Sequence, residues 1–181
     1  GIDALRWWIT REVPLLGDTE FTTARLVQAH DNDLANGLGN LVNRTLTLLQ
    51  KHYEGRLHPD DGPVAGPVWS SVELDTACTT LPSRVDNALE TADFRSATAH
   101  LVASVDIANQ LLNAAEPWKE VRSPGGDLRR THRLLSAVVR ACRTISTELT
   151  PFCPSGATAL LGQLGEGDRA QSPVPVFARL G

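Results

Sequence analysis

The stretch DNDLANGLGNLVNRTLTLLQ, residues 31–50, decides the fold class. Within it and its flanks, one set of residues returns every three or four positions: Leu34, Leu38, Leu41, Thr45 and Leu49. This spacing lays a largely apolar stripe along one face of an α-helix. We therefore predict a long helix that begins with a cap at Thr22 or Thr23 and ends near Tyr53.

Helical spacing continues over most of the chain, whereas the alternation typical of strands is almost absent. We predict further helices over residues 3–13, from Ser70 or Ser71, from Asp93 to before Pro117, from Asp127 to Pro151, and over 155–164. Their expected buried faces are Leu74, Cys78, Leu81, Val85 and Leu89; Phe94, Thr98, Leu101, Val105, Ala108 and Leu112; and Leu134, Leu135, Val138, Cys142, Ile145 and Leu149. Pro82 should kink or split its helix. The expected architecture is an all-α antiparallel helix bundle.

Two segments show no helical period. Residues 55–70, GRLHPDDGPVAGPVWS, are rich in Pro and Gly and should form a surface loop. Gly165 should end the last helix, and residues 166–181 should form an extended tail. The predicted organisation is thus a helical domain over residues 1–165 followed by this short tail.

Composition excludes several classes of protein. The chain has 181 residues, of which 41% are hydrophobic and 21% charged, values typical of one globular domain. No apolar run approaches the roughly 18 residues of a membrane span, and the net charge of -4 is weak evidence about a polyanionic partner. The absence of Met and of a leader suggests part of a larger protein, or a trimmed one.

The sequence contains no recognisable catalytic or metal-binding constellation. The five His are scattered without ligand spacing, and GxSxG, P-loop and GxGxxG motifs are absent. We expect each His to be solvated or to cap a helix, and no metal or cofactor in this chain. Three Cys without a CxxC pair argue against disulfides and structural zinc. Cys78 and Cys142 should be reduced core thiols, which fits a reducing, cytosolic compartment.

Polar residues beside the apolar stripe form the first candidate site. Asn36, Asn40 and Arg44 are four residues apart and therefore share a helix face, with Asn43 close by. Amides and a guanidinium aligned in this way can present hydrogen-bond donors and acceptors to the edge of an unstacked base. The alternative is that they tie the helix to its neighbours by buried hydrogen bonds.

Trp118 is the second candidate, because it follows Glu116-Pro117 at the end of a predicted helix. An indole left at the surface there could stack on a base, and packing beneath a loop is the alternative. Trp7 and Trp8 are adjacent helical residues and should pack in the core. The arginines of the fifth helix could contact phosphates, although a solvated charged face is favoured: Arg129, Arg130, Arg133, Arg140 and Arg143.

Several segments together resemble one family, the methionyl-tRNA synthetases. GIDALRWWITREVPLLGDTEFT is similar to the segment after that family's KMSKS loop, and DNDLANGLGNLVNRTL to its long anticodon-domain helix. DIANQLLNAAEPW is similar to its ANxxxxxxxPW segment, and PVPVFARLG resembles its LFPRI-like ending, which folds back on the bundle. These segments span nearly the whole chain in the correct order.

The resemblance implies a helix bundle of the class I synthetase anticodon-binding type and assigns roles to residues. The family's Asn and Arg recognise the anticodon, chiefly its first base, cytosine, and its Trp stacks on that base; the matching residues are Asn40, Arg44 and Trp118. Asn36 and Asn43, singled out above by their spacing alone, are expected as supporting residues. The implied partners are initiator and elongator methionine tRNAs and an upstream catalytic domain that uses ATP in the cytoplasm. HIGH-like and KMSKS-like motifs and the zinc knuckle are absent, so this chain should be inactive alone.

Two alternatives remain at the level of sequence. The bundle could be a scaffold in a synthetase-like amino-acid-activating enzyme of specialised metabolism, for example a cupin-fused enzyme that forms an N-N bond, and would then not bind tRNA. It could also be a stand-alone helical module that binds a partner protein or tRNA in trans. The sequence upstream of Gly1 would distinguish them.

Overall fold

One continuous helix runs from Thr23 to Tyr53 and forms the axis of the molecule. The computed structural model describes residues 1–59, 62–64 and 70–181, and this helix comprises α2 (Thr23–Ala29), η1 (His30–Gly39) and α3 (Asn40–Tyr53). The Thr22 side chain accepts a hydrogen bond from the Arg25 amide and caps it. The predicted stripe is buried throughout, from Leu34 to Leu49. The middle segment η1 has the wider π-helical turn, which is often found at functional sites.

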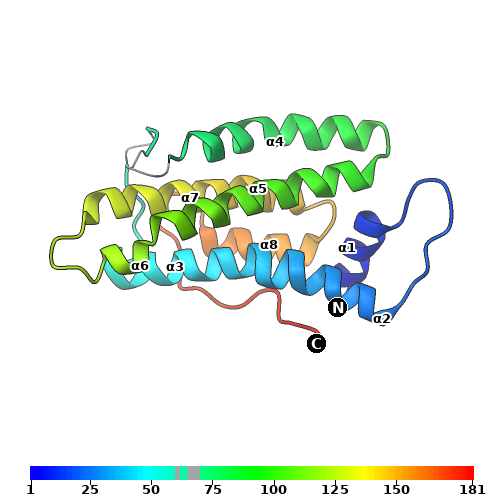
Figure 1. Ribbon diagram of the computed structural model, residues 1–181, viewed down its shortest axis with the longest axis horizontal. Coiled ribbons are helices and arrows are strands. Elements are labelled where there is room, and N and C mark those ends of the chain that lie inside the picture. The colour runs from blue at the N-terminus through cyan, green and yellow to red at the C-terminus, as the bar shows by residue number, and fades with distance from the viewer. Residues whose placement is uncertain (60–61, 65–69) are drawn as a thin grey trace.

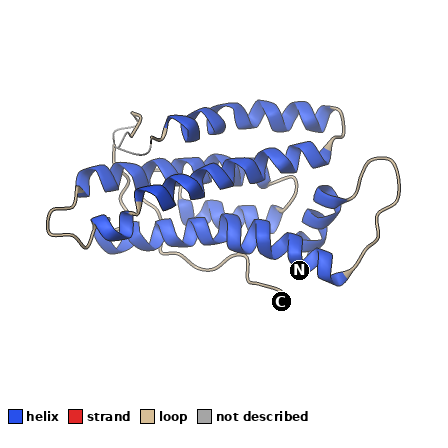
Figure 2. Ribbon diagram, in the orientation of Figure 1, coloured by secondary structure: helices blue, strands red, loops and turns tan. Residues whose placement is uncertain are grey.

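The other helices pack around this axis. They are α1 (Ile2–Glu12), α4 (Val72–Glu90), α5 (Phe94–Ala115), α6 (Pro117–Glu120), α7 (Leu128–Leu149) and α8 (Pro154–Leu164). Helices α4, α5, α7 and α3 lie side by side along the long dimension of the molecule, with α8 behind and α1 at one end (Figure 1). Every regular element of the described chain is helical (Figure 2), which confirms the predicted all-α bundle.

The predicted caps and inner faces are mostly confirmed. Asp93 and Asp127 accept hydrogen bonds from the amides of Ser96 and Arg130 and so cap α5 and α7. The whole predicted face of α7 is buried, and so are Trp7 and Trp8. The Trp7 Nε1 donates to Asp33 Oδ2 at 3.1 Å, which ties α1 to the long helix.

Several details differ from the predictions. Helix α4 runs through Pro82 without being split, because the buried Leu81 and Val85 hold it against the bundle and only one backbone donor is lost. Phe94 begins α5 at the end of the bundle and is 42% exposed rather than buried. Leu89 is half-buried, and its neighbour Ala88 takes the core position.

The predicted loop at 55–70 falls partly outside the described residues, at positions 60, 61 and 65–69. Its described part is not confined to the surface, because Leu57 and Val64 are buried in the core. Ser71 is also buried: its Oγ accepts from the Val64 amide at 2.8 Å and donates to Asp75. This hydroxyl fixes the loop instead of capping α4.

The C-terminal residues run back along the bundle after Gly165, which has a positive φ of 66° (Figure 1). The Ala170 amide donates to the Gly55 carbonyl at 2.8 Å, and the Leu57 amide donates to the Asp168 carbonyl at 2.7 Å. Farther along, the Gln163 side chain donates to the Val174 carbonyl and accepts from its amide. Residues 166–181 therefore lie against the helices at several separate points.

Candidate nucleic-acid interface

Trp118 reaches the long helix because of the turn that precedes it. Glu116 adopts a left-handed conformation with a φ of 43° and ends α5, and Pro117 is the first residue of the short helix α6. Proline suits this position because its missing N–H would have no partner in the helix. The turn brings α6 back toward α3, where the Trp118 ring is half-buried against the core.

Arg44 of α3 meets this ring. Its guanidinium carbon lies 4.9 Å from the centroid of the Trp118 ring, within the range of a cation–π interaction. The Arg44 Nη2 also donates to Asn113 Oδ1 of α5 at 3.1 Å. Asn113 was not predicted from the sequence; its one signal was its place five residues before Trp118, near the end of the helix predicted to begin at Asp93. Helices α3, α5 and α6 thus each contribute one residue to an Arg44–Asn113–Trp118 cluster.

Asn40 lies one helical turn before Arg44 and is exposed. Residues four apart share a helix face, so the Asn40 amide lies beside this cluster. Within the described chain, its side chain makes no hydrogen bond to another protein group. Its donors and acceptor are therefore available to a ligand.

The supporting residues Asn36 and Asn43 lie on the other side of Asn40. Together with Asn40 they line a pocket of about 370 Å³ between the long helix and residues 175–179 of the tail, which we call the amide pocket. Asn36 Oδ1 accepts a hydrogen bond from Arg179 Nε at 2.9 Å. Asn36 thus ties the long helix to the tail, which was the alternative that we considered for these polar residues. Asn43 is half-buried at the pocket wall.

The tail is held beside this pocket by buried groups that the sequence did not reveal. Asp31 accepts hydrogen bonds from the Leu180 and Gly181 amides, at 2.9 and 3.3 Å, and pairs with His30 Nδ1 at 2.8 Å. The hydrogen bond with His30, reinforced by the Leu180 amide, lowers the pKa of the Asp31 carboxyl. His30 is only 5% exposed, so the expectation of a solvated or capping His was wrong at this position.

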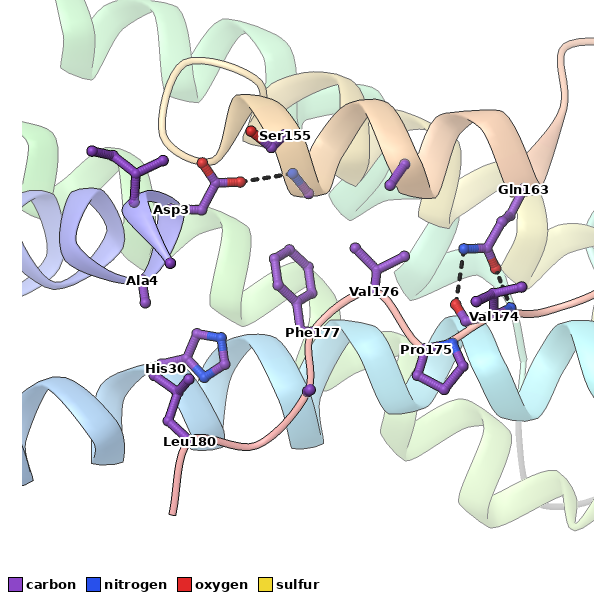
Figure 3. Close-up of a pocket in the computed structure, with 15 residues that line it drawn as sticks. Asp3, Ala4, His30, Ser155, Gln163, Val174, Pro175, Val176, Phe177 and Leu180 are labelled. Atoms are coloured by element: carbon purple, nitrogen blue, oxygen red, sulfur yellow. Dashed lines mark hydrogen bonds between the residues drawn. The ribbon is translucent and has the colours of Figure 1, made fainter.

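Phe177 anchors the tail from the opposite side. Figure 3 shows its ring pointing from the tail toward α8, beside His30 and facing Asp3 across a pocket of about 590 Å³. Asp3 Oδ2 accepts from the Gly156 amide at 2.7 Å, at the start of α8. A Cβ atom on Gly156 would lie 2.3 Å from the Phe177 ring, so only glycine leaves room for the ring.

The arginines of α7 are not simply a solvated face. Arg143 donates to the carbonyls of Leu164 and Gly167, and burial lowers its pKa. Arg140 and Arg133 donate to loop carbonyls of His58, Gly62 and Pro63. These side chains hold loop residues and the beginning of the C-terminal tail in place. The surface around Arg44 is therefore the better candidate for binding a nucleic acid.

Two negative findings concern the residues that the structure describes. No group of three or more His, Cys, Asp or Glu side chains is placed to hold a metal ion, and no helix is long and apolar enough to cross a membrane. The three cysteines are free thiols; Cys142 is buried as predicted, and Cys78 is half-buried.

Comparison with known proteins finds similarity to methionine-type tRNA synthetases. Residues 1–46 match the family described as "tRNA synthetases class I (M)". The chain is 29% identical over 172 residues to the methionine–tRNA ligase of Caldanaerobacter subterraneus subsp. tengcongensis, which covers 91% of this chain and 25% of that protein. It is 34% identical over 179 residues to the Corynebacterium efficiens enzyme, covering 96% of the chain and 27% of that enzyme. It thus spans about a quarter of these relatives' length.

Solved structures agree with the sequence comparison. The free form of Mycobacterium tuberculosis methionyl-tRNA synthetase superposes with a TM-score of 0.90 at 24% identity, covering all of this chain and 39% of that one. The methionyl-adenylate-bound form of the same protein gives 0.88 at 25% identity, covering 98% of this chain and 38% of that one. The whole bundle, including the returning tail, therefore has a counterpart of the same fold.

Proposed function

Because this chain is a region related to the methionyl-tRNA synthetases, we propose that it recognises the anticodon of methionine tRNA. The observation that carries the proposal is the position of Arg44 over Trp118, with the exposed Asn40 one turn away. Trp118 offers a stacking surface for an unstacked base. Asn40 and Arg44 offer amide and guanidinium groups to the base edge.

The first anticodon base, a cytosine in the CAU anticodon, is the proposed occupant of this site. Cytosine presents a carbonyl acceptor, a ring-nitrogen acceptor and an amino donor, which the Arg44 donors and the Asn40 amide can complement. Asn113 already holds the Arg44 guanidinium, so part of the entropic cost of ordering that long side chain is met before RNA binds. Asn36 and Asn43 line the adjoining amide pocket.

In the complete protein, this region would position tRNA for a catalytic domain that joins methionine to it with ATP. The chain spans only a quarter of its relatives and carries none of the family's ATP motifs. We expect it to form no aminoacyl-adenylate alone and to act in the cytoplasm, where tRNA is charged. The relatives described above are methionine–tRNA ligases, which favours this role over a scaffold in specialised metabolism.

The proposal is tested by measuring binding of a short hairpin RNA that carries the CAU anticodon loop. The hairpin should bind more tightly than one whose first anticodon base is changed to uracil. Trp118→Ala should weaken binding by about 1 to 3 kcal/mol, since one base stack is lost. Arg44→Lys should also weaken it, because lysine keeps the charge but lacks the planar fork of donors.

Phe94→Ala provides the matched control, because Phe94 is an exposed aromatic residue at the opposite end of α5. Its affinity for the hairpin should equal that of the wild type. Unchanged affinity in Trp118→Ala would overturn the proposal. Absence of binding to either hairpin would leave the scaffold role as the better explanation.

A further inference from the structure

We propose that the amide pocket binds a second unpaired nucleotide, adjacent to the base on Trp118, and that the C-terminal tail forms one wall of this site. The inference extends the proposed anticodon recognition and rests on it. The pocket lies between Asn36, Asn40 and Asn43 on the long helix and residues 175–179 of the tail. Asn40 belongs to this pocket and also lies one turn from Arg44, so the two sites are contiguous.

The lining of the pocket suits a nucleotide. Ligand pockets begin at about 300 Å³, and this one measures about 370 Å³. Three amide side chains offer both donors and acceptors to a base edge. Its only charged lining residue within the described chain is Arg179, and no carboxylate lines it to repel a phosphate.

Arg179 is aimed by the contact that it makes. Its Nε donates to Asn36 Oδ1 at 2.9 Å, which leaves the two terminal nitrogens of the guanidinium for another acceptor. A guanidinium with two free nitrogens binds a phosphate through paired hydrogen bonds. The same contact orients the Asn36 amide so that its two N–H donors remain for a base.

The tail wall is fixed before any ligand arrives. The amides of Leu180 and Gly181 are bound by Asp31 on one side of residues 175–179, and Gln163 holds Val174 on the other. Phe177 packs against the long helix at Gly39, where a Cβ atom would lie 3.6 Å from its side chain, an ordinary van der Waals distance. A wall anchored in this way needs little ordering on binding, which favours affinity.

The first test compares two arginines of the same tail with the CAU hairpin as the probe. Arg179→Gln should weaken binding about tenfold, the value of one charge-assisted hydrogen-bonded contact. It should also reduce the slope of log affinity against log salt concentration by about 0.7, as expected for one lost phosphate contact to a single strand. Arg169→Gln removes the same charge from a residue that binds the Glu54 carbonyl outside the pocket, and it should change neither quantity.

The second test removes a base instead of a side chain. An abasic residue is placed in the hairpin on each side of the first anticodon base in turn. One of these two RNAs should bind more weakly, and Asn43→Ala should have no additional effect on that RNA, although it weakens binding of the intact hairpin.

The two proposals fail in different ways. If Arg179→Gln behaves like Arg169→Gln, or if Asn43→Ala acts equally on intact and abasic hairpins, the second site is wrong even though first-base discrimination by the wild type persists. If the wild-type chain does not discriminate the first base at all, both proposals fall.

Discussion

The guanidinium of Arg44 lies over the indole of Trp118, with 4.9 Å between its central carbon and the ring centroid. These residues are far apart in sequence and on different helices. A base that stacks on this face of the ring shares the ring with the guanidinium. The orientation of Arg44 is therefore part of the binding event, and the group that sets it is Asn113.

Asn113→Ala should weaken binding of the CAU hairpin by about 0.5 to 1.5 kcal/mol, because Arg44 loses its hydrogen-bond acceptor. The effect should disappear in an Arg44→Ala background, as a double-mutant cycle measures. Asn87→Ala, at an exposed amide of α4, serves as the control and should have no effect. Equal losses in both backgrounds would show that Asn113 does not act through Arg44.

Gly156→Ala should lower the free energy of unfolding by about 1 to 3 kcal/mol, because the added methyl group overlaps the Phe177 ring. Gly162→Ala lies on the same helix with nothing within 4 Å of the added atom. It should raise stability by about 0.5 to 1 kcal/mol through lower chain entropy in the unfolded state. Urea unfolding measures both, and a loss of similar size at both positions would contradict this role of Phe177.

The anchoring of the tail by Asp31 should depend on pH. The pKa of this carboxyl is lowered in the folded chain, chiefly by the hydrogen bond with His30. The carboxylate therefore stabilises the folded chain at any pH above the pKa that the carboxyl has in the unfolded chain. This stabilisation is lost as the pH falls through the lowered pKa of the folded chain. The difference in stability between the wild type and Asp31→Asn should therefore be full at pH 7 and shrink below about pH 4.

Hydrogen exchange of the Leu180 and Gly181 amides should follow the same course, since both donate to Asp31. Asp18→Asn, at an exposed position of the α1–α2 loop, is the control and should leave that exchange unchanged. Protection that does not vary between pH 7 and pH 3 would argue against the carboxylate as the anchor.

The cysteines should react slowly with thiol reagents in the native state. Burial raises the pKa of Cys78 to about 11 and that of Cys153 to about 12, and it raises the pKa of the fully buried Cys142. At pH 8 only about one Cys78 in a thousand is a thiolate. Cys78 should therefore react first, and all three should react in concentrated denaturant. Rapid native-state modification of Cys142 would show that its helix opens readily.

The sequence predicted most of the helical framework because periodic burial and caps are local properties. The spacing from Leu34 to Leu49 and the aspartates at 93 and 127 indicate helices from neighbouring residues alone. Pro82 was expected to kink or split its helix, and it does not split α4, because the packing of Leu81 and Val85 outweighs one lost hydrogen bond. The burial of Leu57 and Val64 was missed because aperiodic segments give no sign of which residues reach the core.

The candidate site, like the fold, was predicted from the sequence only in part. By itself the sequence determined an all-α bundle and one helix face bearing Asn36, Asn40 and Arg44, since residues four apart on a helix must share a face. Only the tertiary structure decided that Trp118 meets Arg44, that Asn113 holds it, and that Arg179 and the tail close the amide pocket. These contacts join segments remote in the chain, so they depend on how the helices pack rather than on any local pattern.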